Sequence, residues 1–190
     1  MITKTRKTKE TDIEISLKLY GNGISDIKTG VGFLDHMLES FSKHSLIDLN
    51  IACKGDTHID DHHSVEDVGI VLGSLLSEAI YPAEGIERFA NVNIVMDEAC
   101  VSCDLDISNR PYLVYEVDLD GKVGTFDTEL SEEFFRAFVT SARISTHLTL
   151  LRGKNKHHII EATFKSLAVA IRRAVTKNSR VGIPSTKDVL

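Results

Sequence analysis

One pattern occurs twice in this 190-residue chain, and it constrains the fold more than any other feature. Two adjacent histidines are followed by a glutamate in His62–Glu66 (HHSVE) and again in His157–Glu161 (HHIIE). Each copy opens a stretch whose apolar residues recur at steps of three and four, which predicts a long amphipathic helix. The two helices are expected from 61 to near 82 and from 156 to 175. A repeated helix start of this kind predicts two related halves.

The segments around these helices also occur in the same order in both halves. Alternating apolar and polar residues predict strands at 11–19, 46–53, 92–107 (two strands interrupted at 96–98), 112–119 and 146–151. Helical spacing predicts shorter helices at 33–44 and 130–144, and no Pro- or Ser-rich linker separates the halves. We therefore expect a single α+β domain over 1–190, made of two fused pseudo-repeats of about 1–90 and 91–190.

Composition excludes several classes of protein. Mean hydropathy is -0.05, and no run approaches the roughly 18 apolar residues of a membrane span. The first residues lack the apolar segment of a secretory signal, so we expect a cytoplasmic protein. With 22 basic and 28 acidic residues, the chain lacks the basic surface of a general nucleic-acid-binding protein. The three cysteines are expected to be reduced, and the pair Cys100 and Cys103 to pack within a strand.

The repeated motif predicts a metal site. Residues four apart lie on one face of a helix, so the first His and the Glu of each motif can bind one cation. The middle His points about 100° away and cannot easily serve the same ion. We expect two metal ions, each bound by the pair from one helix and by the middle His of the other helix or of a neighbouring subunit. A solvated helix start would explain one such motif, but not two at matching places.

The shorter helices supply further candidate ligands. His36 lies 26 positions before His62, and Glu133 lies 24 positions before His157, at an analogous helix start. His147, on a predicted strand, competes with Glu133 for this role. Imidazole and carboxylate ligands without thiolate suit Mn, Fe, Co, Ni or Zn. The expected metal ligands are His36, His62, His63, Glu66, Glu133, His157, His158 and Glu161.

A net-acidic protein must gather cations locally to bind an anion. Lys165 lies two turns beyond His157 on the same helix face, roughly 12 Å along the axis. That spacing suits a substrate with one end at the metal and an anionic group at the other. The remaining phosphate-binding candidates are Arg88, Arg110 and the tail segment Pro184–Lys187.

Together these segments resemble the imidazoleglycerol-phosphate dehydratase family. The resembling segments are Arg6–Thr11, Thr29–Leu38, Asp60–Gly69, Met96–Ala99, Arg110–Tyr112, His157–Ala162 and Pro184–Lys187. They extend over almost the whole chain, and as a set they are highly specific. Two positions depart from the family pattern, because Asn109 stands where Gly is common and Glu133 where some members have His.

The resemblance implies a fold like the second domain of ribosomal protein S5, with a helix layer packed on a sheet layer. It also implies a shell of 24 copies, two Mn²⁺ ions per active site lying between subunits, and a monofunctional enzyme. The reaction would be that of a carbon–oxygen lyase (a hydro-lyase) of L-histidine biosynthesis. It would convert imidazole glycerol phosphate into imidazole acetol phosphate.

This dehydration removes a C–H proton that no carbonyl group acidifies, so the imidazole ring must store the electrons. An imidazolate held between two metal ions can expel the adjacent hydroxyl group. By resemblance, Glu10 is the acid/base, and Glu66 and Glu161 belong to the catalytic set. The resemblance places the substrate against Glu10, His44, Arg88, Arg110, Lys165, Ser185 and Lys187.

Two other functions fit the same ligands. A metal-storage or metal-sensing protein also uses helical His/Glu pairs, although the strand-rich halves argue against it. A dinuclear hydrolase of phosphate esters would use the same metals to activate water. Analysis of the reaction product separates these functions.

Overall fold

The computed structural model describes all 190 residues, and its two halves contain the same elements in the same order. The first half consists of β1 (Ile2–Lys7), β2 (Thr11–Lys18), β3 (Ser25–Lys28), α1 (Gly32–Ser45), β4 (Asp48–Gly55) and α2 (His62–Ile80). The second half consists of β5 (Phe89–Met96), β6 (Ala99–Asp106), β7 (Tyr112–Glu116), β8 (Lys122–Val123), β9 (Phe126–Asp127), α3 (Glu129–Ala142), β10 (Ser145–Arg152) and α4 (Lys156–Ala174). Only the short hairpin β8–β9 has no counterpart in the first half.

Each half forms a four-stranded sheet with the same topology. The strand orders are β1-β2-β4-β3 and β5-β6-β10-β7. The pairs β3–β4 and β7–β10 are parallel, and the other pairs are antiparallel. Because parallel neighbours need a crossover, α1 and α3 each pass over one face of their sheet.

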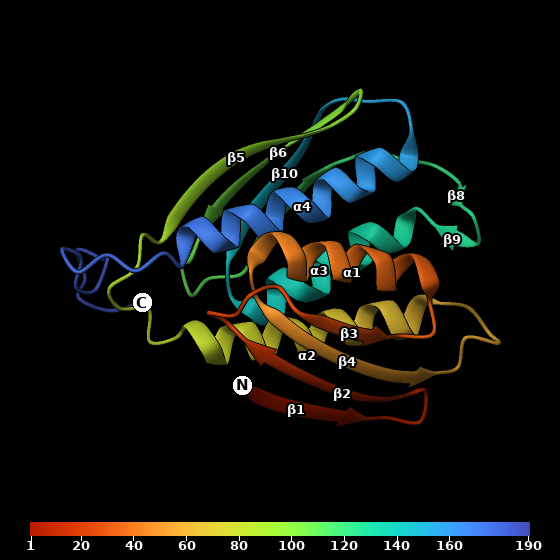
Figure 1. Cartoon of the computed structure of the whole chain (residues 1–190), viewed down its shortest axis with the longest axis horizontal. Helices are drawn as coiled ribbons and strands as arrows, with labels where there is room; N and C mark the ends of the chain where they lie inside the picture. The colour runs from red at the N-terminus through yellow and green to blue at the C-terminus, as the bar shows by residue number, and fades with distance from the viewer.

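The four helices lie between the two sheets (Figure 1). Helices α1 and α2 contact the first sheet, α4 contacts β5 and β6, and α3 contacts β7 of the second sheet. Across the middle, α2 packs against α3 and α1 packs against α4. The expected α+β class is confirmed, and the expected pairing of a helix layer with a sheet layer occurs twice, with the helix layers facing each other.

The hydrophobic core is shared by both halves, in one cluster of 48 buried apolar residues. Phe138 of α3 lies 5.9 Å from Phe41 of α1, and Phe134 lies 5.0 Å from Phe164 of α4, measured between ring centroids. A glycine allows α2 and α3 to approach closely, because a Cβ at Gly73 of α2 would lie 2.3 Å from the carbonyl oxygen of Phe138. Neither half therefore buries its helices alone.

Most predicted elements lie within a few residues of the observed ones, and two differences have clear causes. Strand β1 carries no alternating pattern, because it is an edge strand with five of its six residues exposed. The β8–β9 hairpin has two residues per strand, too few to show a period. Cys100 and Cys103 are buried in β6. None of the four helices combines the length and apolar character that crossing a bilayer requires.

Candidate metal and substrate site

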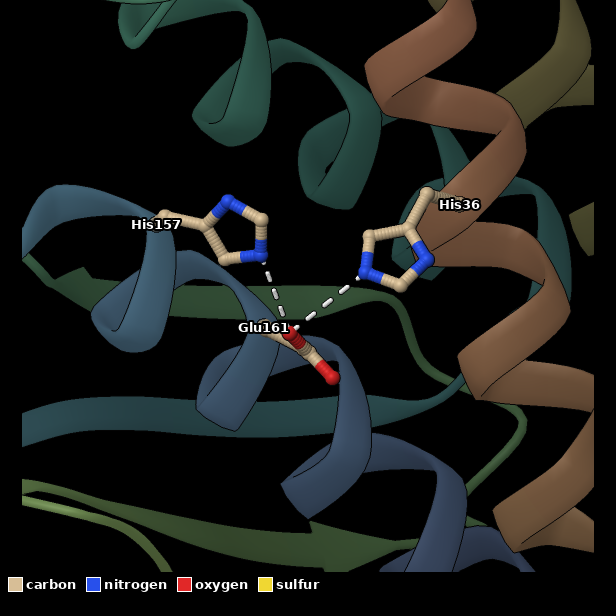
Figure 2. A group of neighbouring side chains, drawn as sticks. All are labelled: His36, His157 and Glu161. Atoms are coloured by element: carbon tan, nitrogen blue, oxygen red, sulfur yellow. Dashed lines mark hydrogen bonds and ion pairs between the residues drawn. The ribbon is translucent and has the colours of Figure 1, made fainter.

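Three predicted ligands come together where α1 meets α4. Oε2 of Glu161 lies 3.2 Å from Nε2 of His157 and 3.6 Å from Nε2 of His36. Figure 2 shows the carboxylate facing both imidazole rings. One ligand atom from each residue lies within 4.8 Å of the others, a spacing at which three atoms can surround one cation. Of all the His, Cys, Asp and Glu residues in the chain, this is the one such group of three.

Local sequence positions this triad of His36, His157 and Glu161. His157 and Glu161 are one helical turn apart on α4, while His36 lies in the second turn of α1. The carboxylate of Asp35 accepts hydrogen bonds from the N–H and the hydroxyl of Thr29, and so ties the start of α1 to the preceding loop. The ring of Phe33 packs edge-on against His157 at 5.2 Å. The triad therefore sits on two packed helices rather than on a flexible loop.

Lys165 favours the ionised form of Glu161. Its Nζ lies 2.7 Å from Oε1 of the buried Glu161 carboxylate. Burial by itself would raise the pKa of Glu161, but the hydrogen bond and charge of Lys165, with His36 and His157, lower that pKa below its ordinary value. Lys165 lies two turns beyond His157 along the helix axis, as expected, but its ammonium contacts Glu161, because helical side chains lean toward the N-terminus.

In the first half, the equivalent pair lacks a third ligand within the same chain. Nε2 of His62 lies 3.9 Å from Oε2 of Glu66. Glu133, the counterpart of His36, instead has Oε1 at 3.9 Å from Nε of Arg136 on its own helix. His147 lies on the outer face of β10, exposed, whereas its neighbours Thr146 and Leu148 are buried toward the helices. Neither Glu133 nor His147 completes the first-half group in one chain.

His63, the middle histidine of the first motif, is held by carboxylates. Its Nδ1 lies 3.1 Å from Oδ2 of Asp56, in the loop before α2. Its Nε2 faces Oε1 of the exposed Glu10 at 3.8 Å. The hydrogen bond with Asp56 raises the pKa of His63, opposed by partial desolvation and supported by Glu10. Glu10 thus lies beside a predicted metal ligand although it comes from the β1–β2 turn.

His158, the middle histidine of the second motif, has a matching environment. Its Nδ1 lies 2.8 Å from Oε2 of Glu98, and its Nε2 lies 3.8 Å from Oδ2 of Asp97. The hydrogen bond between Glu98 and His158 raises the pKa of the imidazole and is the largest cause that lowers the pKa of Glu98 to about 2. The rings of His157 and His158 are 6.2 Å apart between centroids. As expected from the helix period, the middle histidine points away from the triad.

The phosphate-binding candidates divide into two groups. Arg88, Arg110, Ser185 and Lys187 line one groove of about 810 Å³ formed with the C-terminal segment. The guanidinium of Arg88 pairs with Asp106 at 2.7 Å and donates to the carbonyl oxygen of Pro184. Lys165 is separate from this groove and lies at the triad.

The C-terminal segment, which lines the groove, lies beyond the C-terminal end of α4 (Figure 1), and the triad lies at the other end of this helix. The backbone N–H of Arg88 donates to the carbonyl of Ala174, at the last turn of the helix, whereas His157 is in its first turn. At 1.5 Å per residue the two ends are roughly 25 Å apart. A small phosphate ester cannot reach both from within one chain. The structure therefore does not bring these four residues to the triad of the same chain.

His44 lies near the triad, in the last turn of α1. Burial, followed by the charges of Lys165 and Arg172, lowers the pKa of His44. Arg172 also donates to the carbonyl oxygen of His44 at 3.0 Å. Its surroundings therefore favour the neutral form of the imidazole, close to the cation that faces Glu161.

Sequence reasoning assigned no role to Asp56, Asp97 or Glu98. The segment Met96–Ala99 was among the resembling segments, but the spacing along the chain does not reveal that Glu98 in this segment contacts His158, 60 positions away. The departure at Asn109 has a simple explanation. Its φ is 56°, in the left-handed region that Gly and Asn both adopt readily, and its N–H donates to the hydroxyl of Tyr81.

Comparison with known proteins decides the family. The family model described as imidazoleglycerol-phosphate dehydratase matches residues 29–171. The chain belongs to the imidazoleglycerol-phosphate dehydratase family. A family member from Sulfurimonas denitrificans is 77% identical over 190 residues, covering 100% of both chains. One from Campylobacter concisus is 66% identical, covering 98% of this chain and 96% of that protein.

Solved structures of the family agree with the fold. The dehydratase of Staphylococcus aureus has a TM-score of 0.83 at 46% identity and covers 94% of this chain and 100% of that chain. The Pyrococcus furiosus enzyme, solved in complex with (S)-C348, has a TM-score of 0.85 at 38% identity, covering 98% and 100%. The resemblance found in the sequence is thus confirmed, and with it the class of enzyme, a hydro-lyase.

Proposed function

We propose that this protein dehydrates imidazole glycerol phosphate to imidazole acetol phosphate in histidine biosynthesis, in a metal-dependent reaction. Family membership supports the reaction. The observation that carries the metal dependence is the triad, in which two imidazole nitrogens and a carboxylate oxygen converge within 4.8 Å.

The donor set of the triad fits a divalent transition metal. Mixed imidazole and carboxylate ligands suit Mn²⁺ and its neighbours, and we propose two Mn²⁺ ions per active site. His36, His157 and Glu161 would hold one ion, and His62 and Glu66 would belong to the other. When bound, the ions would supply positive charge at the substrate imidazole and so stabilise its imidazolate form.

Other side chains near the proposed metal ligands would transfer protons and bind the substrate. Glu10 is exposed, and its carboxylate lies 3.8 Å from His63, so it can give or take a proton at a substrate bound beside that histidine. Lys165 and His44 present polar hydrogen-bonding groups near the triad. Holding the glycerol chain in place brings its C–H and hydroxyl within reach of such groups.

We propose further that the active site lies between subunits of a homo-oligomer, a shell of 24 copies. Three features support a shared site: the first-half pair lacks its third ligand, the middle histidines point away from the triad, and the Arg88 groove lies roughly 25 Å from it. In an oligomer, the Arg88 groove of one copy could lie beside the triad of a neighbouring copy. The substrate is then a small phosphate ester held at that boundary.

We also propose that the enzyme is cytoplasmic, does not bind nucleic acid and is not attached to a membrane. The net charge of -6 argues against nucleic-acid binding, because the phosphate backbone of a nucleic acid binds to basic surfaces.

Product analysis tests the function. Mn²⁺-loaded protein is incubated with imidazole glycerol phosphate, and the mixture is examined by mass spectrometry, with His157→Ala protein as the control. We expect imidazole acetol phosphate from the unaltered protein and at least ~100-fold less from the control. Release of inorganic phosphate instead would indicate a hydrolase. Bound metal without any turnover would favour storage, and either result contradicts the proposal.

A further inference from the structure

Glu98 connects a distant hairpin to the metal-binding end of α4. It lies in the turn between β5 and β6, and its carboxylate reaches the loop between β10 and α4. Oε2 lies 2.8 Å from Nδ1 of His158. Oε1 accepts hydrogen bonds from the backbone N–H of Asn155 at 2.7 Å and of Lys154 at 3.1 Å. One side chain therefore uses both oxygens at the start of this helix.

These contacts reach the N-cap of α4. Asn155 is the N-cap, and its Oδ1 accepts from the N–H of His157 at 2.9 Å and of His158 at 3.3 Å. Because Glu98 holds the backbone of Asn155, it also holds this cap. The cap orients the first turn, which carries His157 into the triad.

The same carboxylate also selects the tautomer of His158. An ionised carboxylate only accepts hydrogen bonds, so Nδ1 of His158 must carry the proton that joins them. The proton then cannot be on Nε2 of the neutral ring, and the Nε2 lone pair is available to a metal ion. Carboxylates that orient metal-binding histidines in this way are common in metalloproteins.

In the two halves, the carboxylate that contacts the middle histidine comes from different parts of the fold. In the first half the carboxylate on His63 comes from Asp56, directly after β4. The equivalent position directly after β10 is Gly153, with φ of 156°. A Cβ there would lie 2.7 Å from the side chain of Ile159, so no acidic residue fits. Support for the second-half histidine must come from elsewhere, and the β5–β6 turn supplies it.

We propose that Glu98 is a positioning residue, which fixes the tautomer of His158 and the start of α4 so that this helix presents Nε2 of His158 to a divalent metal ion. The inference rests on the proposed metal-dependent function. It assigns Glu98 no contact with the substrate.

The variant Glu98→Gln separates positioning from folding. Its amide oxygen can still accept from the N–H of Asn155, which preserves the cap. Its NH₂ group then donates to Nδ1 of His158, which moves the ring proton to Nε2 and blocks the ligand atom. Glu98→Ala removes both contacts and shows the combined effect. Glu78→Gln, at an exposed position on α2, is the matched control.

Two measurements on the full chain test the inference. Mn²⁺ affinity is measured by titration of metal-free protein, and we expect Glu98→Gln to bind about 10- to 100-fold more weakly, as is typical when such a supporting carboxylate is lost. The tautomer is measured by ¹⁵N NMR of histidine-labelled, metal-free protein, with the His158 signal assigned by its loss in His158→Gln. We expect Nδ1–H in the unaltered protein and Nε2–H in Glu98→Gln, with the same unfolding temperature.

The outcomes separate this inference from the proposed function. Wild-type Mn²⁺ affinity or an unchanged tautomer in Glu98→Gln would overturn the inference. So would a defect confined to Glu98→Ala, since that indicates a structural role only. If the unaltered protein binds Mn²⁺ but does not convert imidazole glycerol phosphate, the proposed function fails while the Glu98 comparison still decides the inference. If it binds no Mn²⁺, both fail.

Discussion

Nζ of Lys165 lies 2.7 Å from Oε1 of Glu161, one turn earlier on α4, while the other carboxylate oxygen faces His36 and His157. The cation therefore occupies one oxygen and leaves the other for a ligand role. Because Glu161 is buried, its charged form depends on this partner.

Replacing Lys165 should make metal binding more sensitive to acid. In Lys165→Met, burial is no longer opposed by the ammonium, so the pKa of Glu161 rises and protons compete with the metal at higher pH. Between about pH 8 and about pH 5, the Mn²⁺ affinity of Lys165→Met should fall by at least ~10-fold more than that of the wild-type protein. The measurement is Mn²⁺ titration across this range. Lys28→Met, at an exposed position on β3, is the control, and parallel curves for the two variants would contradict the expectation.

Histidine variants distinguish the triad from the outer sheet face. His36→Ala removes one of three converging ligands, so the protein should lose about one bound Mn²⁺ per chain. His147→Ala should retain it, because this side chain lies on the outer face of β10. Elemental analysis after dialysis measures both. Equal metal loss in the two variants would show that the triad is not the binding site.

Replacing Glu10 should lower the rate of the reaction without lowering the amount of bound metal. Glu10→Gln keeps the shape of the side chain but cannot take up a proton, so kcat should fall by about 10²- to 10⁴-fold. Bound Mn²⁺ should be unchanged. Steady-state kinetics are compared with Glu14→Gln, a change at an exposed position on β2. A normal kcat in Glu10→Gln would remove it from the proton-transfer role.

The contact between α2 and α3 should not tolerate a single methyl group at Gly73. A Cβ there would lie 2.3 Å from the backbone carbonyl of Phe138 and 3.0 Å from the N of Ala142. Gly73→Ala should lower the free energy of unfolding by about 1–3 kcal/mol. The control is Gly32→Ala, because a Cβ at the first residue of α1 meets nothing within 4 Å. Chemical denaturation measures both, and equal stability of the two variants would contradict the packing argument.

Asp48 should make the protein sensitive to acid. Its carboxylate accepts from the N–H of Asn22 at 2.7 Å and of Ile24 at 3.0 Å. The Ile24 and Asn22 hydrogen bonds lower the pKa of Asp48, so its contribution to stability is present above the ordinary carboxyl pKa and is lost as pH falls through the lowered value. In Asp48→Asn, the loss of stability on acidification below about pH 4 should be smaller. Asp26→Asn, an exposed carboxylate on β3, should behave like wild type in denaturation curves measured across this range.

The local elements were predictable because their signals are local. The apolar positions of α2 and α4 repeat with the helical period, and the strand at 11–19 alternates because one face is buried. The same reasoning missed β1, since an edge strand with both faces exposed has no reason to alternate. It also did not show that the ammonium of Lys165 contacts Glu161, because spacing along a helix says nothing of where a long side chain bends.

By itself, the sequence determined the duplicated order of elements, the pairing of His157 with Glu161, and the family, because all three depend on residue types at fixed spacings along the chain. The tertiary structure decided which residues meet across that chain. Only the packing of α1 on α4 brings His36 to the pair, and only the β5–β6 turn brings Glu98 to His158. Contacts between distant residues depend on how helices and sheets pack, and that packing comes from the shared core of both halves rather than from any local pattern.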